Sequence, residues 1–259
     1  YNAEANTYHS IEIERFEKKR YFRLHEDNSP EYQKYILESC RNIAEAEWGI
    51  KNDYEAVLIC SDGYIQTNPR EIFNTEKVTT IATHHQTHAL SALYLSPFDK
   101  ALIVSYDGGG DDGHFNIYVG DKQNGKIKLL KKVESDFGGG YLLCGAMVRE
   151  VSESSRHMLA LSGKIMGLCA YGDVIEEYVD AFSEFFFDRD FNKLAKVTGL
   201  PLKNVDTPWK DPLQMYVFED KKGYDISASA QAGFENAFFS VLDKYDTEVP
   251  LIVTGGCAL

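Results

Sequence analysis

The chain has 259 residues, 44% of them hydrophobic, and a formal net charge of −13 at pH 7. This composition is ordinary for a globular protein and predicts one large domain or two smaller ones around a sizeable core. The acidic balance excludes a surface that binds a nucleic-acid backbone, because such surfaces cluster Lys and Arg. No apolar run approaches the roughly 20 residues that cross a bilayer, and the first residues lack a secretion signal. We therefore expect a soluble, cytoplasmic protein with neither nucleic-acid nor membrane partners.

The ends of the chain and its cysteines add two expectations. The chain begins at Tyr1 without an initiator Met and stops at Leu259, just after a strand-like run enters a glycine turn. A domain rarely finishes at such a junction, so a fragment is expected. The five cysteines show no CxxC spacing, which predicts free thiols rather than disulfides or a zinc ribbon. They are Cys40, Cys60, Cys144, Cys169 and Cys257.

Strand and helix patterns alternate through the first part of the chain. Alternating residues over 9–16 predict a strand, and apolar residues at helical spacing predict a helix over 30–48 that starts at Pro30. Short apolar runs at 56–60 and 78–82 predict buried strands. This alternation favours an α/β layer architecture.

A histidine cluster follows the second of these buried strands. Residues 84–88 read His-His-Gln-Thr-His, and the alanines and leucines around them favour a helix over 83–93. In a helix, His84 and His88 lie on one face and can share a metal ion, whereas His85 points elsewhere. Two imidazoles with an added carboxylate favour an open, catalytic metal site. The alternative is a polar helix end with solvated histidines.

A glycine-rich turn led by Asp107 joins two further predicted strands. Residues 101–106 and 114–119 are strand-like, and a third run at 126–130 follows an Asn-Gly pair, a strong hairpin signal. The glycines therefore lie at a hairpin tip in an antiparallel meander. Rossmann and P-loop nucleotide sites place their glycines between a strand and a helix, whereas the sugar-kinase, heat-shock and actin group of ATPases has its phosphate loops in hairpins. An ordinary flexible hairpin is the alternative.

The rest of the chain combines helices, a polar stretch and two glycine-containing segments. Residues 163–172 combine Lys164 with three glycines, so the backbone could approach a ligand while the ammonium meets an anion. A solvated surface lysine is the alternative. The other predicted elements are a helix over 174–187, a polar, loop-rich stretch over 188–212 with Pro201 and Pro208, a long helix over 226–245, and a strand leading into Gly255-Gly256.

Taken in order, these motifs resemble those of O-carbamoyltransferases of the NodU/CmcH type, the nodulation-factor and antibiotic-tailoring enzymes. The resemblance runs through most of the chain, and the order and spacing of its blocks are more specific than any single block. The blocks are Ile13-Glu14-Arg15-Phe16, His84-His85-x-x-His88-Ala89-x-Ser91-Ala92, Ser96-Pro97-Phe98, Asp107-Gly108-x-Gly110, Gly163-Lys164-x-Met166-Gly167-Leu168-x-Ala170-Tyr171-Gly172, Gln231 with Glu235, and Gly255-Gly256-x-Ala258-Leu259.

The resemblance implies an incomplete actin-like fold related to the enzyme that transfers threonylcarbamoyl to tRNA. Residues 1–99 would form a first actin-like subdomain without its opening strand, and residues 100–259 a second subdomain truncated at its C-terminus. The family's first phosphate loop, a further metal-binding aspartate, an asparagine after Leu259 and a C-terminal domain that makes carbamoyl-adenylate are missing from this chain. The fragment alone is therefore expected to be inactive.

The resemblance also implies a biosynthetic function. A carbamoyl group would pass from carbamoyl-adenylate, made from carbamoyl phosphate and ATP, to a hydroxyl of a small-molecule acceptor. A divalent metal, iron or manganese, would be held by His84, His88 and Asp107. A homo-oligomer is compatible with this role. The implied nucleotide-binding residues are Gly108, Gly109, Gly110 and Lys164 near the phosphates, and Gly255 and Gly256 near the adenosine.

Some residues depart from the family pattern, and the general base of the implied reaction is not assigned. Asp111 stands where the family commonly has glutamate, and Cys257 where a small aliphatic residue is usual. Residues 135–141 follow the family's serine-glycine-tyrosine pattern only loosely. His85 and His114 are the candidates for a general base, with structural or substrate-facing roles as the alternative.

Two other functions compete with carbamoyl transfer. One is a non-catalytic, nucleotide-binding actin-fold module, which would have no need to keep three metal ligands together. The other is a sugar-kinase-like phosphotransferase, which would need a catalytic aspartate and magnesium held by carboxylates and phosphate. The histidine-rich cluster counts against the kinase.

Overall fold

The computed structural model describes residues 9, 15, 18, 29–52, 54–60, 66–81, 83–199, 218–245 and 248–258. Apart from His9 and Arg15, the predicted strand over 9–16 lies outside these residues, and Arg15 itself is helical. Pro201, Pro208 and Leu259 also lie outside the described residues. The chain divides into two compact units, residues 1–84 and 85–259, and each is described by itself.

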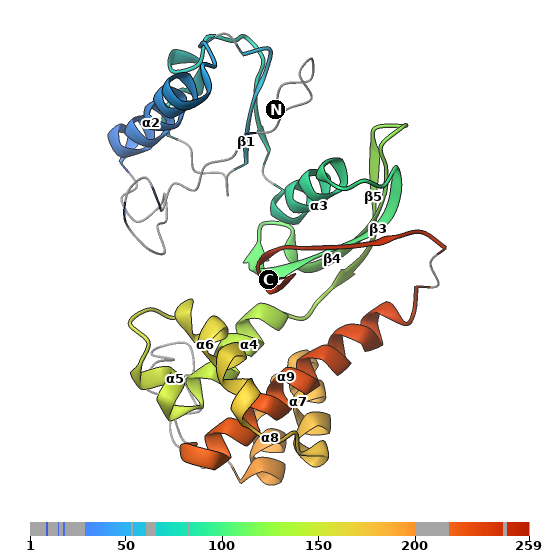
Figure 1. The fold of residues 1–259 in the computed structure, drawn as a ribbon. Helices are drawn as coiled ribbons and strands as arrows, with labels where there is room; N and C mark the ends of the chain where they lie inside the picture. The colour runs from blue at the N-terminus through green and yellow to red at the C-terminus, as the bar shows by residue number, and fades with distance from the viewer. Residues whose placement is uncertain are drawn as a thin grey trace. The chain divides into compact units, whose positions relative to one another are not determined.

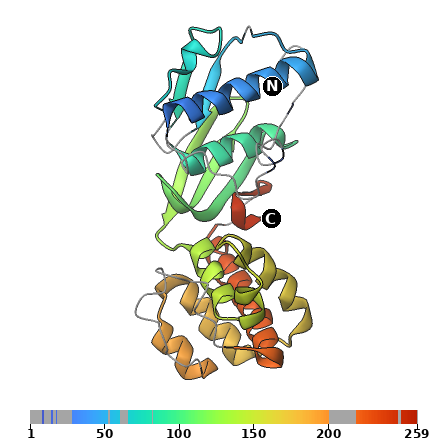
Figure 2. The same cartoon turned by 90° about the vertical axis from the view of Figure 1, so that its left-hand side faces the viewer.

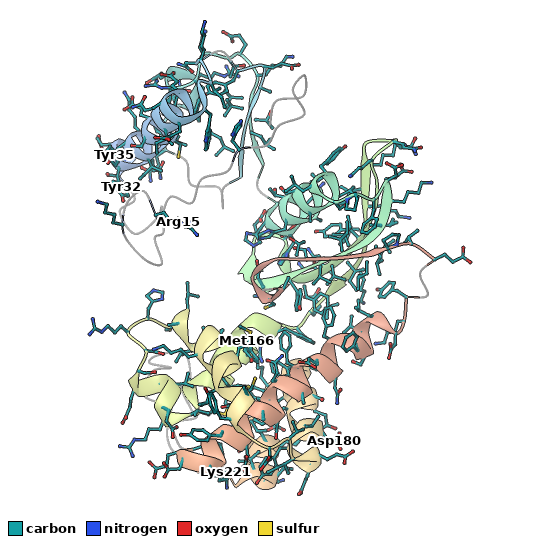
Figure 3. The ribbon with its side chains drawn as sticks, viewed as in Figure 1. Arg15, Tyr32, Tyr35, Met166, Asp180 and Lys221 are labelled. Atoms are coloured by element: carbon teal, nitrogen blue, oxygen red, sulfur yellow. The ribbon has the colours of Figure 1, made fainter. Side chains whose placement is uncertain are left out.

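The first unit contains one long helix and a pair of strands, so its predicted α/β character is confirmed. Helix α2 (Pro30–Trp48) begins after Ser29, whose hydroxyl accepts a hydrogen bond from the Tyr32 N–H at 3.2 Å. It ends at Gly49, which has a φ of 64°. Figure 3 labels Tyr32 and Tyr35 on this helix. Strands β1 (Val57–Cys60) and β2 (Val78–Ile81) pair in parallel, and the 3-10 helix η1 (Pro69–Glu71) lies between them in sequence.

The second unit is built on a four-stranded sheet in the order β5-β4-β3-β6. Strands β3 (Lys100–Gly110), β4 (Gly113–Asp121) and β5 (Lys126–Val133) are antiparallel neighbours, so the predicted meander is confirmed. Strand β6 (Leu251–Thr254) is parallel to β3. Helix α9 (Asp220–Leu242) precedes β6 in sequence and lies on one side of the sheet (Figure 1).

The two faces of this sheet have separate cores. Helix α3 (His84–Leu95) packs Ala89 and Leu93 against Ala101, Ile103 and Tyr118. This packing agrees with the division into units, since the second unit begins at His85. On the opposite face, an aromatic core packs between the sheet and a helical layer. Figure 2 shows this helical layer below the sheet. The rings of the core belong to Tyr106, Phe115, Phe137, Phe234 and Phe238.

The helical layer corrects one interpretation of the sequence and shows the structure of the lysine-glycine block. The lysine-glycine block forms α6 (Ala160–Leu168) and the 3-10 helix η2 (Cys169–Tyr171), so Gly163 lies inside a helix. The predicted loop-rich stretch is wrong over α8 (Phe191–Thr198), which Asp190 caps at its start and Gly199 ends. The remaining elements are α4 (Phe137–Ala146), α5 (Arg149–Glu153), α7 (Glu176–Asp188) and η4 (Gly256–Ala258).

Two further expectations concern membranes and thiols. Among the described helices, none is both long and apolar enough to span a bilayer. Cys40, Cys144, Cys169 and Cys257 are free thiols, as their spacing predicts.

Candidate metal and nucleotide site

The first turn of α3 is held by a residue from the glycine-rich hairpin. Asp112 accepts hydrogen bonds from the backbone N–H groups of His85 at 2.8 Å and Gln86 at 3.1 Å. A carboxylate on these N–H groups acts as an N-cap supplied by another element, and its charge suits the helix N-terminus. The hairpin therefore fixes how α3 presents its histidines.

His84, His88 and Asp107 come together at this end of the hairpin. One ligand atom from each lies within 4.8 Å of the others, and His88 Nε2 is 3.4 Å from Asp107 Oδ2. Asp107 Oδ1 also accepts a hydrogen bond from the Gly109 N–H at 2.7 Å. All three residues are half-buried. Two imidazole nitrogens and one carboxylate oxygen are a donor set that suits a divalent transition metal with coordination positions left for other ligands.

His85 occupies a different position, between α3 and the sheet. Its Nδ1 is 2.8 Å from Ser105 Oγ and its Nε2 is 2.9 Å from the Gly113 carbonyl oxygen. A carbonyl only accepts, so we assign the proton to Nε2. The ring is fully buried, and Nε2 also lies 3.6 Å from Asp107 Oδ1. Both nitrogens of His85 are therefore occupied by structural contacts, which leaves His114 as the candidate for a base.

Two glycine turns flank Asp107. The first runs from Gly108 to Gly110, where the pairing of β3 and β4 is interrupted by an irregularity. The second is Gly255-Gly256: Gly255 has a φ of 93°, and a Cβ there would lie 3.0 Å from the carbonyl carbon of Tyr106. A Cβ on Gly256 would lie 3.5 Å from Asp107 Cβ. The structure thus brings both predicted glycine segments beside the carboxylate.

Lys164 lies in a different environment. Its ammonium donates hydrogen bonds to the carbonyl and the hydroxyl of Ser154. The residue lines a pocket of about 360 Å³ with residues that include Glu150, Leu168 and Tyr171, and Met166 of the same helix is labelled in Figure 3. Within the described part of the chain, no hydrogen bond connects Lys164 to either glycine turn.

The start of α4 also contacts the site, and the sequence patterns missed it. Asp136 caps α4 by accepting a hydrogen bond from the Gly139 N–H at 2.7 Å. A Cβ on Gly138 would lie 2.6 Å from the carbonyl carbon of Asp107, so this helix packs directly on the backbone of the glycine turn. An Asp followed by a helical run is an N-cap signal that could have located this helix start.

The Cys257 thiol lies close enough to Asp107 and Asp136 to be affected by their charges. Burial raises the pKa of the Cys257 thiol to about 12, and the negative charges of Asp107 and Asp136 add to the effect. The thiolate is the form that binds metals and attacks electrophiles. At neutral pH the Cys257 thiol is therefore held in its protonated form, which is a poor nucleophile.

Comparison with known proteins identifies the family. A family model described as Carbamoyltransferase N-terminus matches residues 14–259. The chain belongs to this carbamoyltransferase family.

Individual proteins are similar to the chain at lower than 30% identity. The chain is 29% identical over 187 residues to "Nodulation protein NolNO" of Sinorhizobium fredii, covering 69% of this chain and 25% of that protein. It is 28% identical over 168 residues to "Nodulation protein NolO" of Bradyrhizobium diazoefficiens, covering 61% and 27%. A third relative is "Uncharacterized protein MJ1051" of Methanocaldococcus jannaschii, 28% identical over 185 residues, with 68% and 33% covered. The chain thus spans about a quarter to a third of the length of these curated relatives.

The cap on α3 gives a first prediction for this carbamoyltransferase chain. Asp112→Ala removes the acceptor for two N–H groups at the start of α3, and loss of an N-cap typically costs about 0.5–2 kcal/mol of stability. Because the cap also orients two metal-ligand candidates, we expect metal affinity to fall about 10–100-fold, as for other residues that orient ligands. Titration of metal into the purified complete protein, together with urea unfolding, measures both effects.

The matched control is Asp180→Asn on α7, an exposed position labelled in Figure 3. This variant should leave both stability and metal affinity unchanged. Wild-type metal affinity in the Asp112→Ala variant would show that α3 keeps its position without the cap.

Proposed function

We propose that this chain carries the metal and nucleotide site for transfer of a carbamoyl group from carbamoyl-adenylate to a hydroxyl of a small-molecule acceptor. The observation that carries the proposal is the convergence of His84, His88 and Asp107 next to two glycine turns. Membership of the carbamoyltransferase family supplies the group that is transferred. Carbamoyl phosphate and ATP would be the sources of the adenylate.

The residues divide this task between them. A divalent ion held by His84, His88 and Asp107, iron or manganese, would polarise carbamoyl or phosphoryl oxygens of the donor. The glycine turn 108–110 lies next to that position and would stabilise the negative charge of departing AMP through backbone N–H groups other than that of Gly109, which donates to Asp107. The pair Gly255-Gly256, of which Gly256 lies beside Asp107, would contact the adenosine. Lys164 would be a further contact to the phosphates, as the family resemblance implies, and in the structure its ammonium donates hydrogen bonds to Ser154.

The proposed fold is the actin-like one. A three-stranded antiparallel meander followed, after intervening helices, by a parallel strand on β3 supports this proposal. In such a fold the phosphate-binding turns are hairpin tips, which is where the structure has Gly108 to Gly110.

The deciding experiment gives the complete protein carbamoyl phosphate, ATP and a panel of hydroxylated acceptors. We expect AMP and a carbamoylated acceptor in equal amounts, and bound metal in the purified protein by elemental analysis. Formation of ADP with a phosphorylated acceptor would favour a kinase, and nucleotide binding without turnover would favour a non-catalytic module. Either of those outcomes would contradict the proposed transfer.

A further inference from the structure

Beside the proposed metal site, three polar side chains each pack against a glycine. They lie so close that the glycine could not carry a Cβ. A methyl group on any of these glycines would come within 2.8 Å of the neighbouring side chain. The pairs are His114 on Gly109, Asp136 on Gly139 and Arg189 on Gly140. Two of these glycines lie in the first turn of α4, where each costs up to about 1 kcal/mol relative to Ala. The sequence therefore keeps space for Asp136 and Arg189 at the expense of helix stability, whereas the φ of 118° at Gly109 by itself favours glycine there.

The three side chains form a series. His114 Nδ1 lies 3.7 Å from Asp136 Oδ1, and Arg189 Nη2 lies 4.0 Å from Asp136 Oδ2. Exposure decreases along the series, from 44% for the His114 side chain to 24% for Asp136 and 22% for Arg189. An imidazole thus faces solvent with a carboxylate behind it and a guanidinium behind that carboxylate.

The contacts of His114 leave one nitrogen available as a base. Its Nδ1 is 3.2 Å from the Gly108 carbonyl oxygen, which can only accept, so we assign the proton to Nδ1. The unprotonated Nε2 has no hydrogen-bond partner among the described residues. A histidine whose Nδ1 proton is held by an acceptor, with a carboxylate nearby and Nε2 open, is similar to the arrangement by which enzymes activate hydroxyl groups.

Arg189 shows features that packing alone does not explain. Its φ of 57° follows from its position as the left-handed C-cap of α7, so the unexplained feature is its side chain. Its guanidinium lies over the Phe185 ring at 5.4 Å, and its Nη1 and Nη2 are buried without a hydrogen-bond acceptor in the described part of the chain. Burial lowers the pKa of this group, while Asp136 opposes that shift. Burying an incompletely paired cation is costly, and an apolar side chain would fill the same space more favourably.

Resting on the proposed carbamoyl transfer, we propose that His114 is the catalytic base that takes the proton of the acceptor hydroxyl, with Asp136 and Arg189 as positioning residues. The acceptor oxygen forms a bond to the carbamoyl carbon, and the bond between that carbon and the phosphate oxygen breaks. The hydroxyl proton moves to Nε2 of His114, and AMP leaves with the electron pair. Asp136 stabilises the imidazolium that results, and Arg189 holds Asp136 in place.

The first test is His114→Gln in the complete protein. We expect kcat for carbamoyl transfer to fall about 100-fold or more, with the acceptor KM, the metal content and ATP–pyrophosphate exchange unchanged. In His114→Gly, added imidazole should restore part of kcat. The control His157→Gln changes another histidine of the same unit and should leave kcat unchanged.

The second test separates positioning from folding. Arg189→Met keeps the side-chain volume and should lower kcat about tenfold without changing the acceptor KM, whereas Arg189→Lys should keep more of the activity. In the double variant with His114→Gln, Arg189→Met should have no further effect on kcat, because residues that act as a unit are not additive.

These experiments can contradict the role of His114 without contradicting carbamoyl transfer itself. A wild-type kcat in His114→Gln, or additive losses in the double variant, overturn the role of His114 and its partners while leaving carbamoyl transfer intact. A wild-type protein that forms no carbamoylated product overturns the proposed function and this inference with it.

Discussion

Asp107→Ala is expected to remove the bound metal from the complete protein. The carboxylate contributes one of three ligand atoms that lie within 4.8 Å of one another, and it also holds the turn through the Gly109 N–H. Loss of a residue that only orients a ligand weakens metal binding about 10–100-fold, so loss of a ligand should exceed 100-fold. His88→Ala should have a similar effect, because the helix then presents only one of the two imidazoles.

Metal content after dialysis and the metal-dependent shift in Tm measure this effect without any assay of activity. A ligand that binds only the folded state stabilises it in proportion to its occupancy, so the wild-type protein should show a Tm increase with metal that the Asp107→Ala variant lacks. His157→Ala, at a histidine outside the cluster, should behave as the wild type. Full metal content in Asp107→Ala would mean that the cluster does not bind the ion.

Local sequence signals located those elements whose boundaries are set by neighbouring residues. Helix α2 was predicted within its observed limits, because Pro30 pre-sets the first turn and apolar residues recur at helical spacing. The meander followed from alternating runs and an Asn-Gly pair. His84, His88 and Asp107 were found because two of them lie one helical turn apart and the third leads a glycine turn.

Features that depend on distant contacts could not be predicted in this way. Asp112 caps α3 from 27 residues along the chain, and Arg189 reaches Asp136 from the far end of α7. The first three glycines of α4 look like a flexible loop in sequence. In the structure they allow the Asp107 backbone and the side chains of Asp136 and Arg189 to pack closely on α4. The contacts with Asp107 and Arg189 come from other parts of the chain, so the local sequence does not indicate them. The sequence does not indicate α8, because this short segment contains polar and charged residues between Phe191 and Leu194. Those two side chains are buried in the folded protein.

Gly138→Ala tests the contact between α4 and the glycine turn. A Cβ at this position would lie 2.6 Å from the carbonyl carbon of Asp107 and 2.7 Å from Gly108 N, and both are backbone atoms that cannot rotate away. Overpacking of this kind costs roughly 1–3 kcal/mol. The shift should also move Asp107 relative to His88, so metal affinity should fall even though no ligand has been changed.

Gly163→Ala provides the matched control for this substitution. Gly163 lies inside α6, and a Cβ there would meet no atom within 4 Å. Alanine should therefore stabilise the protein by up to about 1 kcal/mol through helix propensity alone and leave metal affinity unchanged. Urea unfolding and metal titration of the two variants should thus give opposite signs for stability and different metal affinities. If Gly138→Ala instead stabilised the protein as Gly163→Ala does, α4 could not be packed on the Asp107 backbone, and the placement of Asp136 beside His114 would fail for the same reason.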